Sequence, residues 1–218
     1  FFMQKTAYDI SACLVGSEMC IRDRYDSDIK DSLKNILQAV DLKKNFPPYV
    51  KLHLEITAVL NDKRNLKKLI KKYWSLNPSS LLRSIIIKIL NDNDLTEIKF
   101  INEIINNNAS EEESKKLLIY FAIKNLKWDI ARENVIGMIG SNPSKDICYF
   151  MSDIELGENN DKQKSDAWIM RAENAKLENS WICSITNQSQ EEWSSLSDSG
   201  NYNSLVWSSP MMIRQNSN

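Results

Sequence analysis

Residues 117–131 read LLIYFAIKNLKWDIA and carry the clearest structural signal in the chain. Their apolar side chains recur three and four positions apart, first up to Lys124 and again from Trp128, a pattern that predicts two amphipathic helices. Asn125 and Leu126 separate the two runs, and asparagine tolerates the left-handed backbone that a tight turn between helices needs. The stretch therefore predicts a helical hairpin with its turn at Asn125.

The same periodicity extends from residue 28 to about residue 175. Stops fall at Pro47-Pro48, Asn77-Pro78 and Asn142-Pro143, because proline lacks a backbone N–H and disfavours helix in the residue before it. Pro47 and Pro78 are 31 residues apart, and Pro78 and Pro143 are 65 apart, or two periods of about 32. We expect helices at about 28–43, 48–61, 63–76, 79–91, 94–107, 111–125, 128–140, 144–157 and 161–176.

In its details the best unit resembles the tetratricopeptide (TPR) repeat, a helix-turn-helix unit of about 34 residues. The resemblance lies in the aromatic Trp128 at the start of a second helix, in the small Ala131 where two helices touch, and in Pro143 twelve residues later. Pro78 marks an equivalent boundary. The resemblance to the TPR repeat implies an all-α fold, a TPR-like α-solenoid of stacked helix hairpins over residues 25–176. The groove of such a solenoid receives protein partners.

The end of the chain has the spacing of a zinc ribbon. Positions 183, 186, 196 and 199 follow the x2, x9, x2 layout of two metal-binding knuckles, but they hold Cys183, Thr186, Leu196 and Ser199. One thiol and two hydroxyls do not hold Zn²⁺, so we expect a degenerate ribbon-like tail without metal at residues 177–210 and a disordered C-terminus at 211–218. Gly200 suits the second turn, and the expected tail core consists of Trp181, Trp193 and Trp207.

Composition favours helices and argues against a nucleic-acid partner. The chain has 28 basic and 29 acidic residues, a formal net charge of -1, and only five glycines and five prolines. The basic stretch 63–72 alternates with leucine and isoleucine at helical spacing, which indicates a solvated helix face. No apolar run of about 18 residues occurs, so we expect this chain by itself to be soluble. The four cysteines show no CxxC pair, which favours a reducing compartment.

No motif predicts catalysis. The sequence lacks a phosphate-binding glycine loop and a catalytic triad signature, so we expect no enzyme and no bound cofactor. His53, the only histidine, and Cys148 both lie in helical patterns and are expected to be ordinary helix residues. A haem- or metal-handling protein that uses His53 or Cys183 stays open as an alternative.

Residues 11–24, SACLVGSEMCIRDR, closely resemble translated sequencing-adapter read-through. This resemblance implies that residues 1–24 are non-native; the alternative is a disordered leader. The native N-terminal part would then be missing.

Degenerate TPR pairs followed by Trp168, Trp181 and a damaged ribbon resemble the C-terminal half of the HemY-type TPR proteins of alphaproteobacteria, over about residues 28–210. The family implies a non-catalytic scaffold for protein partners, held at the bacterial inner membrane by an N-terminal segment absent here and associated with haem biosynthesis. A second TPR-plus-ribbon family, which regulates lipopolysaccharide assembly, offers an adaptor for another client as an alternative.

Overall fold

In this computed structural model, residues 29–43, 45–175 and 179–209 are described. The chain divides into two compact units. One unit is Lys43–Lys176, and the other combines Phe1–Leu42 with Leu177–Asn218. The predictions for residues 1–24 and 211–218 lie outside the described residues.

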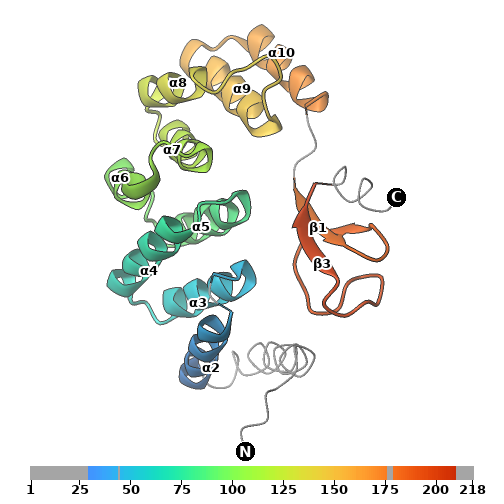
Figure 1. Cartoon of the computed structure of the whole chain (residues 1–218). Coiled ribbons are helices and arrows are strands. Elements are labelled where there is room, and N and C mark those ends of the chain that lie inside the picture. Colours follow the sequence, from blue (N-terminus) through green and yellow to red (C-terminus); the bar gives the residue numbers. More distant parts are fainter. Residues whose placement is uncertain (1–28, 44, 176–178, 210–218) are drawn as a thin grey trace, which may run out of the picture. The chain divides into compact units, whose positions relative to one another are not determined.

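The described chain is mostly helical (Figure 1). The helices are α2 (Ile29–Leu42), α3 (Pro47–Val59), α4 (Lys63–Leu76), α5 (Ser80–Asp92), α6 (Ile98–Ile105), α7 (Glu112–Lys124), α8 (Trp128–Ile136), α9 (Lys145–Asn159) and α10 (Lys162–Glu173), with a 3-10 turn at Asn106–Asn108. Each helix predicted from the sequence pattern is present, and most ends agree within a few residues. Among the described residues, no helix is long and apolar enough to cross a membrane.

Helices α3 to α10 form four hairpins that follow one another at a regular spacing. The first helices of the hairpins begin at Pro47, Ser80, Glu112 and Lys145, at a repeat interval of about 33 residues. Proline residues lie at or just before three of these helix starts. Pro47 occupies the first turn of α3, where its missing N–H costs no hydrogen bond. Pro78 and Pro143 lie one residue before the N-caps Ser79 and Ser144. The period read from the prolines is thus the spacing of the helix starts.

The first helix of each hairpin is followed by one residue in the left-handed conformation. These residues are Asn61, Asp94, Leu126 and Asn160, with φ between 51° and 55°, and they recur at the same repeat interval. After α7, the backbone N–H of Lys127 donates to the Ala122 carbonyl at 2.8 Å, and the N–H of Leu126 donates to the Ile123 carbonyl at 3.0 Å. These two hydrogen bonds form a Schellman motif. The left-handed residue here is Leu126, so the prediction for Asn125, whose φ is -92°, is wrong.

Neighbouring hairpins pack through both of their helices. Helix α3 contacts α5, α5 contacts α7, and α7 contacts α9, while α4 contacts α6, α6 contacts α7 and α8 contacts α9. Two apolar clusters result, one across α3 to α7 around Trp74 and Phe121, and one across α7 to α9 around Ile119 and Ile154. Buried Trp74 donates its indole N–H to Ser114 Oγ at 2.9 Å, which joins α4 to α7. Side-chain burial between neighbouring hairpins therefore forms the core of this unit.

Two helix boundaries differ from the predicted ones. Helix α6 begins at Ile98 and not at residue 94, because Asp94 is left-handed and Leu95 folds back to donate its N–H to the Leu90 carbonyl at 2.9 Å. Helix α8 ends at Ile136 and not at residue 140. Met138 and Ile139 still pack against the second apolar cluster, so the apolar pattern continues where the helix does not.

The tail contains a small antiparallel sheet in the order β2-β1-β3. Strand β1 (Ser180–Cys183) pairs with β2 (Ser189–Gln190) and with β3 (Leu205–Ser208). Trp181 and Trp207 are direct cross-strand partners, with ring centroids 5.3 Å apart in an edge-to-face arrangement. The all-α prediction is therefore correct for the helical unit, and the tail adds three short strands.

Candidate functional site

The most distinctive polar site lies where two turns of the tail meet at Cys183. The first turn follows β1 and ends at Asn187, which is left-handed at φ 58° and donates its N–H to the Cys183 carbonyl at 2.8 Å. The second turn ends at Gly200, with φ 80°, and its N–H bonds to the Ser197 carbonyl at 2.8 Å. Nothing lies within 4 Å of a Cβ built on Gly200, so its backbone angle, not space, is what favours glycine there.

The two turns bring together three of the four predicted knuckle positions. Thr186 Oγ1 donates to Ser199 Oγ at 3.1 Å, and both side chains lie close to buried Cys183. Leu196 does not join them, since it is 42% exposed and forms a bridge with Tyr202. Ser197 lies there instead, buried, with its Oγ 3.8 Å from Cys183 Sγ and 3.0 Å from Ser199 Oγ.

Polar groups surround the Cys183 sulfur. The Sγ donates to Ser204 Oγ at 3.2 Å and accepts from Asn201 Nδ2 at 3.8 Å. Hydrogen bonds from Ser199, then Ser204 and Thr186, lower the pKa of the Cys183 thiol to about 5. The hydroxyl and amide groups around this buried sulfur therefore favour its charged form.

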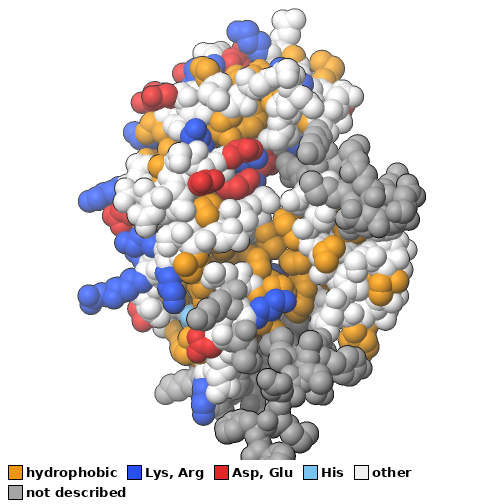
Figure 2. Space-filling model, viewed as in Figure 1, with side chains coloured by type: hydrophobic (Ala, Val, Ile, Leu, Met, Phe, Trp, Pro, Cys, Tyr) orange, Lys and Arg blue, Asp and Glu red, His pale blue; other side chains and the backbone are white. Residues whose placement is uncertain are grey.

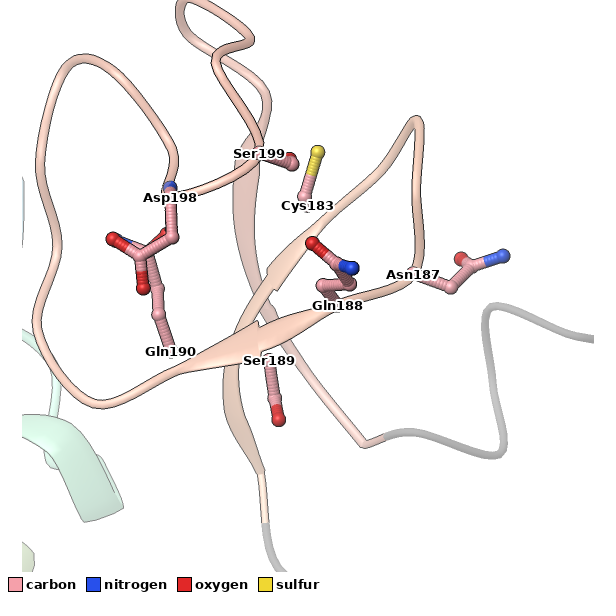
Figure 3. A pocket seen from close by; sticks show the side chains of 7 residues that line it. All are labelled: Cys183, Asn187, Gln188, Ser189, Gln190, Asp198 and Ser199. Atoms are coloured by element: carbon pink, nitrogen blue, oxygen red, sulfur yellow. The ribbon is translucent and has the colours of Figure 1, made fainter.

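An open hollow of about 450 Å³ lies beside this sulfur and is lined by amide and hydroxyl groups. Figure 3 shows Cys183 and Ser199 side by side, with Gln190 and Asp198 together across the hollow and Asn187 and Ser189 pointing away. The Asp198 backbone N–H donates to Gln190 Oε1 at 3.0 Å, which connects the second turn to β2. Much of the polar lining therefore serves to hold the turns in place.

The donor set does not suit a metal ion. Zn²⁺ needs about four nitrogen, thiolate or carboxylate ligands, whereas the meeting point offers one thiolate and otherwise only hydroxyl and amide groups. Within the described ranges, no group of three or more His, Cys, Asp or Glu side chains could hold a metal.

The predicted tail core is only partly buried. Trp181 is 5% exposed, whereas Trp193 and Trp207 are half-buried. The indole N–H of Trp207 is buried without a hydrogen-bond partner. Of the three tryptophans, Trp181 is therefore the one buried in the sheet, together with Ile182 and Leu205.

The residues predicted to define the repeat lie at contacts between hairpins. Ala131 is fully buried in the second apolar cluster, and Pro143 is buried before α9. The half-buried ring of Trp128 lies on the backbone of Gly157 in α9, so closely that a Cβ there would come within 2.3 Å of the ring. No sequence pattern indicated this contact, although Gly157 lies within the helix predicted at 144–157 and within α9 as found.

His53 and Cys148 are core residues. His53 is 5% exposed, its Nδ1 lies 2.7 Å from Tyr73 Oη, and burial together with the positive charge of Lys72 lowers its pKa. Cys148 is fully buried, and burial raises the pKa of its thiol. Neither side chain lies in an open site.

A network of ion pairs joins α5, α7 and α9. Arg83 Nε contacts Glu113 at 2.7 Å, and its guanidinium also pairs with Asp146. Buried Lys116 contacts Glu112 at 2.7 Å and lies 3.8 Å from Asp146. Arg83 and Lys116 lie one repeat interval apart, as do Glu113 and Asp146. These charges neutralise one another between repeated positions, which indicates a structural role.

Comparisons of this chain with protein-family models, curated proteins and solved structures found no significant match.

Proposed function

We propose that this chain is a non-catalytic scaffold, a TPR-like α-solenoid of HemY type that binds protein partners at the bacterial inner membrane in connection with haem biosynthesis. The observation that carries the scaffold function is the even spacing of the starts of α3, α5, α7 and α9, with an interval of about 33 residues. Even spacing, with most contacts between elements close in sequence, is typical of repeat proteins that present an extended binding surface. The link to haem rests on the sequence resemblance alone.

The partner surface in this proposal follows the first helices of the hairpins. Ile87, Tyr120 and Asp153 occupy equivalent positions on α5, α7 and α9, one repeat interval apart, and each is partly or fully exposed. At the end of this row, α9 exposes Tyr149 by 42% and Leu156 by 48%. Exposed aromatic and aliphatic side chains in such a row suit the apolar face of a partner helix or peptide.

The test measures binding of the purified full chain to each purified enzyme of the last steps of haem synthesis by biolayer interferometry. We expect micromolar or tighter binding to at least one enzyme, and Tyr149→Ala/Leu156→Ser should weaken it at least tenfold. Met170→Ser, which removes a 60% exposed side chain from α10, is the matched control and should leave binding unchanged. Absence of binding to every enzyme would refute the haem assignment and favour another client, such as envelope or lipopolysaccharide assembly.

We also propose that the tail is a zinc ribbon in which hydrogen bonds replace the metal. The support is the meeting of both turns at Cys183 and its distance of 3.8 Å to Ser197 Oγ. Sulfurs on a tetrahedral Zn²⁺ lie about 3.8 Å apart, given Zn–S distances of about 2.3 Å.

Restoring three thiols tests this proposal. Thr186→Cys/Ser197→Cys/Ser199→Cys should bind one Zn²⁺ per chain by elemental analysis, because all three substituted residues lie close to Cys183. The variant with Leu196→Cys in place of Ser197→Cys should bind weakly, because Leu196 is exposed and turned away. Equal zinc content in both variants would contradict the geometry of the second turn.

The alternative of a haem- or metal-handling protein has a direct test on the unmodified chain. A Soret band after haem addition that His53→Ala abolishes, or stoichiometric zinc, would support it. Their absence would exclude it.

A further inference from the structure

Helix α4 has an unusual charge composition. Its sequence is KRNLKKLIKKYWSL, with six basic residues and no acidic one. Every other described helix that carries lysine or arginine also carries aspartate or glutamate. The net charge of the whole chain is -1, so this helix concentrates positive charge that the rest of the chain offsets.

Packing fixes which way these charges point. Leu66, Ile70, Tyr73 and Trp74 are at most 4% exposed and hold one face of α4 in the core. The basic residues occupy two columns on the other side, one with Lys63, Lys67 and Lys71 and one with Arg64, Lys68 and Lys72. Residues four apart in a helix are about 6 Å apart along the axis, so each column is about 12 Å long. Leu76, 54% exposed, continues the second column.

Few of these charges are neutralised. Lys71 pairs with Glu103 at 3.3 Å, and Lys67 Nζ lies 4.7 Å from the centre of the Phe100 ring. The other four, Lys63, Arg64, Lys68 and Lys72, are exposed and form no ion pair among the described residues. We call these four residues the basic ridge. Figure 2 shows basic side chains projecting from the side of the helical unit where α4 lies.

Exposed aliphatic side chains flank the basic ridge in the sequence. Leu60, at the end of α3, is 39% exposed and precedes Lys63 by three residues, and Leu76, on the same column of α4, follows Lys72 by four. A bilayer surface offers anionic headgroups beside an apolar layer, and both parts match this arrangement. A nucleic-acid duplex offers dense phosphates but no apolar layer for the leucines. The apolar face of α4 itself stays in the core, so contact with a bilayer would be peripheral.

We infer that the basic ridge, with Leu60 and Leu76, docks this chain on the surface of an anionic phospholipid bilayer. The docking is reversible and electrostatic, and it is separate from any membrane-spanning anchor and from partner binding by the hairpin row. Each basic residue near an anionic surface contributes about fivefold to partitioning, which is the equivalent of about 1 kcal/mol. Binding should therefore depend steeply on ionic strength.

Vesicle co-sedimentation of the full chain tests this inference. The vesicles are phosphatidylcholine alone, or phosphatidylcholine with about one third phosphatidylglycerol, at low and at high salt. We expect binding to the anionic vesicles at low salt, little binding to neutral vesicles, and release at high salt. Arg64→Gln/Lys68→Gln/Lys72→Gln should weaken partitioning about 100-fold, because three charges are lost.

The matched control removes three positive charges elsewhere, with Lys88→Gln/Lys127→Gln/Lys162→Gln. These lysines are exposed and form no ion pair among the described residues, so the control has the same net charge as the ridge variant. The control should bind nearly as well as the unmodified chain. Leu76→Ser should weaken binding a few-fold without changing its salt dependence.

Equal loss in both triple variants would overturn the inference, since net charge alone would then explain binding. Equal binding to neutral vesicles would also overturn it. Tighter binding to a DNA duplex than to anionic vesicles would assign the basic ridge to nucleic acid instead. Circular dichroism should show unchanged helix content in both variants, because every substituted side chain is exposed.

Discussion

Substitution of Gly157 by alanine should destabilise the helical unit, although alanine is the better helix former. A Cβ at this position would lie 2.3, 2.7 and 3.0 Å from three atoms of the Trp128 ring, whereas ordinary contacts begin at about 3.4 Å. The ring must move by about 1 Å or more to restore an ordinary contact distance. Overpacking of this kind costs about 1–3 kcal/mol, and the gain in helix propensity offsets about 1 kcal/mol. We expect a net loss of about 1 kcal/mol.

Urea denaturation followed by circular dichroism measures this loss. Gly137→Ala is the matched control, because Gly137 has φ -65° and the nearest atom to its added Cβ is 4.0 Å away. The control should stabilise the chain by about 0.4–1 kcal/mol. The two alanine substitutions should thus act in opposite directions.

Repeating the Gly157→Ala substitution in a chain that carries Trp128→Ala shows whether the Trp128 ring causes the loss. In Trp128→Ala chains the obstacle is gone, so Gly157→Ala should become stabilising by up to about 1 kcal/mol. If Gly157→Ala stabilises the unmodified chain as much as Gly137→Ala does, the Trp128 ring does not lie against Gly157 and the reasoning is refuted.

Three further substitutions test other parts of the structure. Leu126→Gly should raise the free energy of unfolding by about 1 kcal/mol, because a 68% exposed leucine with φ 55° gives way to a residue without a left-handed penalty; a lower urea midpoint would contradict this. Trp181→Ala should destabilise the tail by about 3–5 kcal/mol, measured by hydrogen exchange of the strand amides. The ultraviolet absorbance of the Cys183 thiolate, taken as the difference from Cys183→Ser, should titrate near pH 5. Since the folded pKa lies below the unfolded one, this thiolate stabilises the tail fully above pH 9 and loses that effect as pH falls to about 5; a midpoint near 9 would refute it.

Sequence periodicity predicted the helices well because most of them bury apolar side chains along one face. It failed at the ends, where an apolar side chain belongs to a loop: Leu95 closes the end of α5, and Met138 and Ile139 pack after α8 has ended. A buried side chain is apolar both in a helix and in the loop that follows it, so the apolar pattern alone does not show where a helix ends. The left-handed Leu126 was missed because leucine rarely takes that conformation, and the Schellman hydrogen bonds override its preference.

Three side chains of the spacing noted in the tail, those of Cys183, Thr186 and Ser199, lie together in the structure. Leu196 does not join them, and Ser197 Oγ lies 3.8 Å from Cys183 Sγ instead. Turn length depends on backbone hydrogen bonds such as that of the Ser197 N–H with the Asn201 carbonyl, at 2.9 Å, which no residue pattern reveals.

The ion pairs between α5, α7 and α9 have a consequence for how such a chain changes length. Arg83 and Lys116 are equivalent positions one interval apart, and so are Glu113 and Asp146. Helix α7 therefore offers a cation, Lys116, to α9 and an anion, Glu113, to α5. Loss of the whole α7–α8 hairpin would leave Arg83 opposite Asp146, with which it already pairs, whereas a partial insertion between these helices would leave a buried charge unpaired. The charges thus favour a change of length here by a whole hairpin.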